Sequence, residues 1–431
     1  MDSSVLIMNP DRSFLIFAVV FSTLVYTFEL YLQIRQHSHF SIQKRKKSIE
    51  SIVTDEEFQK MQNYSRDKSR FAFFKNAFDH IQTVSVWLLF ILPFLWKFSG
   101  NRLRSFGYDE DSEIIQSLVF VLILSIPLQF IQIPFDLYFT FIIEEKHGFN
   151  KQSLKLFFTD QIKGLFISSI IGLPVLAILL FIIKRFGEMF PIYVWGFLFV
   201  FKIVMVTIYP IFIQPCFNKT EQLPIGTLRT KIEDLAGKLE FPLSKLYSVD
   251  GSRRSAHSNA YIYGFFKNKR IVLFDTLIEQ CTEEQIVAVL GHELGHWKLN
   301  HVLKMLFFSE VQTIVMFSLF QKVMYTRELY QSFGFDEEMP VLIGLVLFSI
   351  MYSPITHVIS FIINWYSRRN EFAADDFSKS LGYAKVLKEA LIVMQKKNLG
   401  NIVPDSWYST YHYSHPPIVE RLSALSKTKS E

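Results

Sequence analysis

The sequence predicts a mainly α-helical fold, in which a polytopic bundle of membrane-spanning helices carries a smaller water-soluble part. Half of the 431 residues are apolar and 16% are aromatic, including 45 phenylalanines. The mean hydropathy of +0.23 is positive, which is rare for soluble domains of this length. A helix needs about 20 apolar residues to cross a bilayer, and seven runs reach or approach that length. These predicted spans are Phe14–Gln33, Thr83–Phe98, Ile114–Phe135, Leu165–Ile183, Ile192–Ile213, Val302–Phe320 and Val341–Trp365.

Positive charge is distributed unevenly around the first span. The tail before it contains only Arg12, whereas the segment after it is rich in lysine and arginine. Because short loops rich in these residues stay in the cytosol, we expect a lumenal N-terminus. With seven spans, the segments 144–163, 216–301 and 366–431 then face the cytosol. The basic residues after the first span are Lys44, Arg45, Lys46, Lys47, Arg66, Lys68, Arg70 and Lys75.

Two further features agree with this orientation. Cys216 and Cys281 both fall on the predicted cytosolic side, where free thiols are expected. Asn63 and Asn218 begin glycosylation acceptor patterns, but they lie on the same side, so we expect neither to be modified. The first span is too long and too poorly flanked for a cleaved signal peptide and should be retained.

Ionisable residues inside the apolar runs predict an aqueous space among the helices. Such groups are costly against lipid and generally face a bundle interior or a water-filled cavity. Glu29 and Asp136 could instead lie at helix ends, where their charged groups would reach the bilayer surface and need no internal cavity. It explains the other three less well. The residues concerned are Glu29, Asp136, Lys202, Glu310 and His357.

The water-soluble part is interrupted by membrane spans. We divide the chain into residues 1–215, with five spans, residues 216–301, residues 302–365, with two spans, and residues 366–431. The second and fourth segments are the two halves of the predicted soluble domain.

The sequence His292-Glu293-Leu294-Gly295-His296 predicts a metal site on a helix. Residues four apart lie on one helical face, so His292 and His296 can reach one metal ion. Glu293 lies beside that ion and can accept a proton from a water on it. Thr282-Glu283-Glu284-Gln285 reads as a capping box that begins this helix. Two histidines on an ordinary polar face are the alternative.

A catalytic zinc usually has three protein ligands and one open position. Glu371 is the best candidate for the third ligand, and Asp375 lies one turn later on the same face. A carboxylate there can hydrogen-bond the free nitrogen of a zinc-bound histidine and fix its tautomer. A solvated acidic face beside Arg368 and Arg369 is the alternative, and the metal interpretation gains weight only together with the His292–His296 helix.

Two further segments are candidate parts of the site. Residues 260–266 and 270–274 predict a β-hairpin, whose edge beginning at Asn259 and Ala260 could pair with an extended peptide. An ordinary structural hairpin fits the spacing equally well. His415 precedes two prolines and a helix that begins around Ile418, where it could donate to an oxyanion. A lone loop histidine is more often a surface residue.

The chain resembles the type I CAAX prenyl proteases, a family of membrane zinc endopeptidases that process isoprenylated proteins. The resemblance covers roughly residues 60 to 425. The matching motifs are Ile143–Asn150, Tyr209-Pro210, Phe217–Lys219, Asp250–Ser252, His257–Tyr261, Gly264–Arg270, His292–His296, Ser367–Arg369 with Glu371 and Asp375, and His415–Pro417.

The resemblance implies a seven-helix bundle that encloses a chamber, with a cytosolic gluzincin-type metalloprotease domain at its cytosolic end. It implies removal of the last three residues from farnesylated or geranylgeranylated CAAX proteins, with one Zn²⁺ per chain. His292, His296 and Glu371 would bind zinc, and Glu293 would activate water. Asp375 would be a second carboxylate, acting as proton donor or as support for a histidine. We favour support. His415 and Arg421 would line the site.

Lysines three and five residues from the C-terminus, Lys427 and Lys429, resemble an endoplasmic reticulum retrieval signal. We expect the lipid bilayer and prenylated substrates as partners and no nucleic acid. One rival interpretation is a membrane-protein quality-control protease. Another is a transporter or scaffold, which predicts paired repeats of spans that the sequence does not contain.

Overall fold

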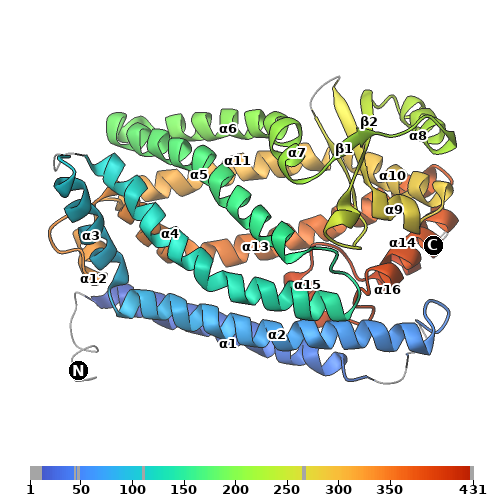
Figure 1. Ribbon diagram of the computed structural model, residues 1–431, viewed down its shortest axis with the longest axis horizontal. Coiled ribbons are helices and arrows are strands. Elements are labelled where there is room, and N and C mark those ends of the chain that lie inside the picture. Colours follow the sequence, from blue (N-terminus) through green and yellow to red (C-terminus); the bar gives the residue numbers. More distant parts are fainter. Residues whose placement is uncertain (1–11, 43–44, 46–48, 109–111, 265–267, 428–431) are drawn as a thin grey trace.

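The computed structural model describes residues 12–42, 45, 49–108, 112–264 and 268–427. Long helices run side by side along the molecule, and a small sheet with several shorter helices lies at one end of them (Figure 1). The predicted mainly helical membrane bundle with a small sheet is confirmed.

Six helical segments of the described residues are long and apolar enough to cross a membrane. They correspond to the first, third, fourth, fifth, sixth and seventh predicted spans. Two of these segments consist of several consecutive helices. In the first, the π-helix η3 (Phe139–Glu144) extends α4 (Glu113–Tyr138). In the second, α6 (Phe190–Ile208) is preceded by η4 (Gly187–Met189) and followed by η5 (Tyr209–Ile213) and α7 (Gln214–Phe217). The main helices are α1 (Ser13–His39), α4 (Glu113–Tyr138), α5 (Leu154–Arg185), α6 (Phe190–Ile208), α11 (His301–Val323) and α13 (Val341–Ser380).

The second predicted span, Thr83–Phe98, is not one continuous helix, although the two helices that contain it are together long and apolar enough for a broken span. It is divided between α2 (Asp55–Leu88) and α3 (Ile91–Ser105), which are bent by 63° relative to each other. Phe90 adopts a left-handed conformation with φ of 52°, which ends the α-helical backbone. Pro93 then lies in the first turn of α3, where a missing N–H group costs little. The uninterrupted apolar sequence hides this break.

The first half of α2 belongs to the soluble end of the molecule. Thr54 caps the helix by accepting a hydrogen bond from Glu57 N, and the Glu57 side chain completes a capping box. Phe58 and Met61 of α2 are buried in a core that contains Val289 of α10 (Glu283–Lys298) and Leu387 of α14 (Ala384–Lys397). This helix therefore joins the bundle to the soluble domain.

The sheet has four strands in the order β1-β2-β4-β3. Strands β2 and β4 are parallel, and the other two pairs are antiparallel. The predicted hairpin is confirmed by the pairing of β3 with β4, in which Ala260 lies opposite Leu273. Phe265, Phe266 and Lys267 of its connection lie outside the described residues. The strands are β1 (Thr220–Gln222), β2 (Leu243–Val249), β3 (Ala260–Tyr263) and β4 (Lys269–Phe274).

Shorter helices complete the fold, and most of them pack around the sheet and the first half of α2 (Figure 1). Helix α16 begins at Ile418, as predicted. Lys44, Lys46 and Lys47 of the basic segment and Lys429 of the C-terminal signal lie outside the described residues. The remaining elements are α8 (Thr227–Lys238), η6 (Gly251–Arg253), α9 (Asp275–Gln280), α10 (Glu283–Lys298), α12 (Arg327–Ser332), α14 (Ala384–Lys397), α15 (Ser406–His412) and α16 (Ile418–Ser426).

Candidate metal centre

Helix α10 carries His292, Glu293 and His296. The predicted capping box is confirmed, since Thr282 Oγ1 accepts from Gln285 N and Gln285 Oε1 accepts from Thr282 N. Ile286, Leu290 and Leu294 form the buried stripe that holds the helix against the soluble core. The two histidines therefore project from a helix that is fixed at its start and along one side.

Helix α13 carries Glu371 and Asp375 and is also the last predicted span. It continues without interruption from Val341 to Ser380, so the predicted boundary between residues 365 and 366 lies inside it. The two carboxylates are buried, whereas Trp365 nearer the membrane is 46% exposed. One rigid element therefore extends from the membrane bundle into the metal centre.

Two glycines of α10 allow it to lie close to α13. A Cβ atom on Gly295 would lie 3.3 Å from Ala374 Cα and 3.1 Å from Phe377 Cβ. A Cβ atom on Gly291 would lie 3.2 Å from Ser378 Oγ, which in turn donates a hydrogen bond to Ala288 O at 3.1 Å. This approach brings Glu371 within reach of both histidines.

His292, His296 and Glu371 each offer a ligand atom, and these atoms all lie within 4.8 Å of one another. His292 Nε2 is 3.1 Å from His296 Nε2. The two nitrogens lie 3.5 and 3.3 Å from Glu371 Oε2 and Oε1 respectively. Ligands bound at about 2.0–2.1 Å to a tetrahedral zinc lie roughly 3.3–3.4 Å apart. The three groups therefore fit a zinc ion.

The Glu371 carboxylate supports the same conclusion. Its Oε2 atom is buried and accepts no hydrogen bond from the described residues, and its nearest nitrogen partners, His292 Nε2 and Arg421 Nη1, each lie 3.5 Å away. An unsatisfied buried carboxylate oxygen is costly unless a cation or other partner satisfies it. A metal ion between the three side chains would supply that partner.

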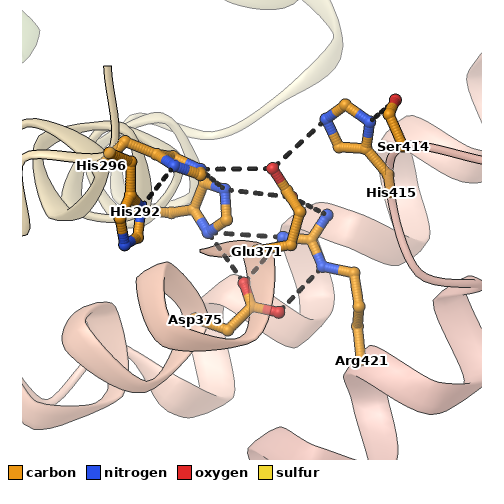
Figure 2. Close-up of polar contacts among 8 residues, drawn as sticks. His292, His296, Glu371, Asp375, Ser414, His415 and Arg421 are labelled. Atoms are coloured by element: carbon orange, nitrogen blue, oxygen red, sulfur yellow. Dashed lines mark hydrogen bonds and ion pairs between the residues drawn. The ribbon is translucent and has the colours of Figure 1, made fainter. Parts of the chain in front are cut away.

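Asp375 contacts His292 on the opposite side of its ring from Glu371 (Figure 2). Asp375 Oδ1 lies 2.8 Å from His292 Nδ1. Arg421 donates to both Asp375 oxygens, at 2.8 Å from Nε and 2.7 Å from Nη2. Asp375 is only 1% exposed. It is therefore a buried carboxylate held between an imidazole and a bidentate guanidinium.

These contacts shift the pKa values of the groups that flank Asp375. Burial disfavours a charge on His292, but its contacts with the carboxylates of Asp375 and Glu371 outweigh burial and raise its pKa to about 9. Burial also opposes the Arg421 charge, yet the neighbouring carboxylates outweigh it and raise the pKa of Arg421. The metal-free site therefore favours a protonated His292 at neutral pH.

The other predicted site residues lie at different distances from this cluster. His415 Nε2 is 3.4 Å from Glu371 Oε1, and its side chain is 66% exposed. Glu293 is half-buried beside His292 and interacts electrostatically with Arg421. Ala260 begins β3 at one edge of the four-stranded sheet, and Asn259 immediately precedes that strand. β4 leads through α9 into α10.

The sequence reasoning missed His301. Its Nδ1 atom lies 3.0 Å from His296 Nδ1, and its side chain is buried. Asn300, in a left-handed conformation, ends one helix and starts the next, which turns His301 back toward His296. The sequence signal that could have identified His301 is its position five residues after His296, just past the expected helix end.

Comparisons with known proteins agree with this geometry. The family model described as the CAAX prenyl protease N-terminal region with five membrane helices matches residues 31–219, and that of peptidase family M48 matches residues 223–429. The CAAX prenyl protease 1 homolog of Oryza sativa subsp. japonica is 47% identical over 95% of this chain and 97% of its own length. The homolog of Homo sapiens is 42% identical over 95% of both chains.

A solved structure extends the likeness to the whole fold. The crystal structure of S. mikatae Ste24p superimposes with a TM-score of 0.90 at 39% identity, over 95% of this chain and 98% of that one. The chain therefore belongs to peptidase family M48, as a multi-pass membrane metalloendopeptidase of the CAAX prenyl protease 1 family.

Proposed function

We propose that this protein is a zinc endopeptidase that removes the last three residues from farnesylated or geranylgeranylated CAAX proteins. The observation that carries the proposal is the convergence of His292, His296 and Glu371 within 4.8 Å, in a chain of the CAAX prenyl protease 1 family. Glu371 comes from the helix that also crosses the membrane, so peptide hydrolysis would take place beside the bundle.

In this proposal His292, His296 and Glu371 hold one zinc ion per chain. When bound, zinc supplies Lewis acidity, which activates water and polarises a peptide carbonyl. Glu293, next to His292 on the same helix, accepts the proton of the attacking water and passes it to the leaving amine. Three protein ligands leave a coordination position free for substrate chemistry.

Three further side chains have supporting roles in the proposal. Asp375 accepts the Nδ1 proton of His292, which leaves Nε2 free to bind metal. Arg421 holds Asp375 in place through two hydrogen bonds. His415, which is exposed and 3.4 Å from Glu371, donates to the developing oxyanion.

The substrate peptide would bind as an additional strand. β3 lies at an edge of the sheet, so the edge that begins at Asn259 and Ala260 can pair with an extended peptide. The prenyl group would occupy a chamber between the membrane helices. Separate binding of the peptide by the sheet and of the prenyl group by the membrane helices would explain why one chain combines a peptidase domain with an apolar bundle.

We further propose that the protein resides in the endoplasmic reticulum membrane, with its N-terminus in the lumen and its soluble domain in the cytosol. The uneven lysine and arginine content on the two sides of the first span supports this orientation. The C-terminal lysines Lys427 and Lys429 support retention in that compartment.

Cleavage of matched peptides tests the proposal directly. Purified protein in detergent or liposomes should release the C-terminal tripeptide from a farnesylated CAAX peptide and act weakly on the same peptide without the farnesyl group. Mass spectrometry identifies the bond that is cut. Equal rates on both peptides would instead favour a quality-control protease, and cleavage of neither would contradict a peptidase of this specificity.

A further inference from the structure

A buried polar cluster lies where the membrane helices meet the loop that leads into β3. We call residues 254–259 the strand-entry loop. Glu144, the last residue of η3, accepts a hydrogen bond from Tyr64 OH at 2.5 Å through Oε1. Its other oxygen, Oε2, lies 3.2 Å from His257 Nε2. Tyr64 and Glu144 are both buried, so this carboxylate is enclosed between α2, η3 and the strand-entry loop.

His257 makes further contacts, although 37% of its side chain is exposed. Its Nδ1 atom lies 3.2 Å from Asn398 Oδ1, and Ser258 N donates to the same oxygen at 3.3 Å. That second bond identifies the Asn398 atom as an acceptor, so both ring nitrogens of His257 face acceptors. Its ring also stacks on Phe149, with centroids 4.0 Å apart.

The backbone of the strand-entry loop is tied to the same membrane helices. Ala256 N donates to Phe149 O at 3.0 Å, and Lys151 N donates to Arg254 O at 3.1 Å. Arg254 also forms a bidentate ion pair with Asp160 of α5, with N–O distances of 2.8 and 3.0 Å. The loop is therefore fixed to α2, α5 and the connection that follows η3.

The strand-entry loop is also hydrogen-bonded to the residues around the start of β3. His257 O accepts from Thr276 Oγ1 at 3.0 Å, and Asn259 O accepts from Phe274 N at 3.0 Å. β3 follows at Ala260, and only its pairing with β4 holds it within the described sheet. Side-chain contacts from the membrane helices thus supplement a strand that has a single ladder.

We propose that Glu144, together with Tyr64, positions β3 for substrate binding through its contact with His257. The inference rests on the proposed function, because it assigns the edge of β3 to the substrate backbone. A strand that pairs with a peptide binds it more tightly when its backbone is already ordered, since less conformational entropy is then lost. Glu144 and His257 are positioning residues in this proposal, and neither contacts the metal ligands.

Kinetics of Glu144→Gln and Glu145→Gln test the proposal. Both variants remove one carboxylate charge from adjacent residues, but Glu145 is exposed and contacts Asn150 rather than His257. Glu144→Gln should raise KM for the farnesylated peptide by about ten-fold, the expected effect of losing a charge-assisted contact, with kcat and zinc content nearly unchanged. Glu145→Gln should behave as wild type. Equal KM values in the two variants would overturn the proposal.

Hydrogen–deuterium exchange gives a test that does not depend on activity. Glu144→Gln should exchange faster than Glu145→Gln at the amides of residues 256–263, while the amides of α10 keep their protection. Tyr64→Phe, which removes a single hydroxyl group, should show a smaller increase in exchange in the same segment. This variant replaces Glu144→Gln in the experiment if Glu144→Gln does not fold. Unchanged exchange in this segment would overturn the proposal. Failure of the wild-type protein to cleave the farnesylated peptide would instead contradict the proposed function.

Discussion

Asp375 Oδ1 lies 2.8 Å from His292 Nδ1, whereas the opposite nitrogen of that imidazole faces Glu371. Asp375 and Glu371 are one turn apart on α13, so a single helix contacts both nitrogens of the ring. In the proposed metal centre, the carboxylate of Asp375 would fix the tautomer in which Nδ1 carries the proton and Nε2 is free for metal. The distance favours support of the histidine over direct proton donation as the role of Asp375.

We predict that Asp375→Asn lowers the affinity for zinc by roughly 10–100-fold, because an amide supports the imidazole less strongly than a carboxylate. Asp376→Asn is the matched control, since Asp376 is exposed and adjacent in sequence. Zinc affinity is measured by competition with a chromophoric chelator. Equal affinities in the two variants would remove Asp375 from the support of the metal centre.

We predict that zinc binding becomes tighter as pH rises toward about 9. Asp375 and Glu371 outweigh burial and raise the pKa of His292 to about 9, so the metal-free site must release a proton before Nε2 can bind metal. Titration calorimetry in buffers of different ionisation enthalpy measures this release. Binding without proton release at pH 7.5 would contradict the prediction.

The same pKa shift predicts how the stability of the metal-free protein depends on pH. The folded-state pKa of His292 is raised from 6.5 to about 9, so protonation of this residue favours the folded state. Its contribution is fully present below pH 6.5 and is lost as pH rises through about 9. In the presence of a chelator, the thermal midpoint of the wild type should therefore fall over this interval more than that of His292→Gln.

We predict that Glu293→Gln abolishes peptide hydrolysis and leaves zinc bound. An amide keeps the shape of Glu293 but cannot accept the proton of the attacking water, whereas His292, His296 and Glu371 are unchanged. Glu279→Gln is a control, because Glu279 is an exposed residue of the preceding helix. Activity and metal content are measured on the same preparations. Full activity of Glu293→Gln would rule out its role as the base.

The helix that bears the histidines could be predicted because its signals are local. The four-residue spacing of His292 and His296 and the capping box at Thr282 depend only on neighbouring residues. Glu371 is 75 or more residues away in sequence, and its role could be proposed only together with the histidines and the family resemblance. The 63° bend within the second predicted span was missed for a related reason, since Phe90 lies inside an apolar run.

The contacts that arrange the site could not be read from composition or periodicity. His301 reaches His296 only because the chain turns at Asn300, and the Glu144–His257 contact joins residues 113 positions apart. Both depend on the packing of separate helices. The continuity of α13 across the membrane boundary was also hidden, because its apolar and polar halves have different compositions.

We predict that Gly295→Ala destabilises the protein and lowers its zinc content. Alanine normally stabilises a helix interior relative to glycine by about 0.5–1 kcal/mol. At Gly295, however, the added Cβ would meet Ala374 Cα at 3.3 Å and Phe377 Cβ at 3.1 Å, which would push α10 away from α13. The control is Gly237→Ala in α8, where no atom lies within 4 Å of the added carbon. The two variants should shift the thermal midpoint in opposite directions, and a stabilising effect at Gly295 would contradict the close-packing argument.

We predict that an N-terminal glycosylation tag is modified in cells, whereas the native acceptors at Asn63 and Asn218 are not. The tag reports a lumenal end, because glycans are added only on that side, and the same tag at the C-terminus should remain unmodified. Asn218 is further constrained by its Nδ2 donation to Asp250 O at 3.1 Å, a contact that a glycan would disrupt. Sensitivity to endoglycosidase, read as a mobility shift on a gel, distinguishes the outcomes. A modified C-terminal tag would reverse the proposed orientation and place the metal centre in the lumen, away from prenylated proteins of the cytosol.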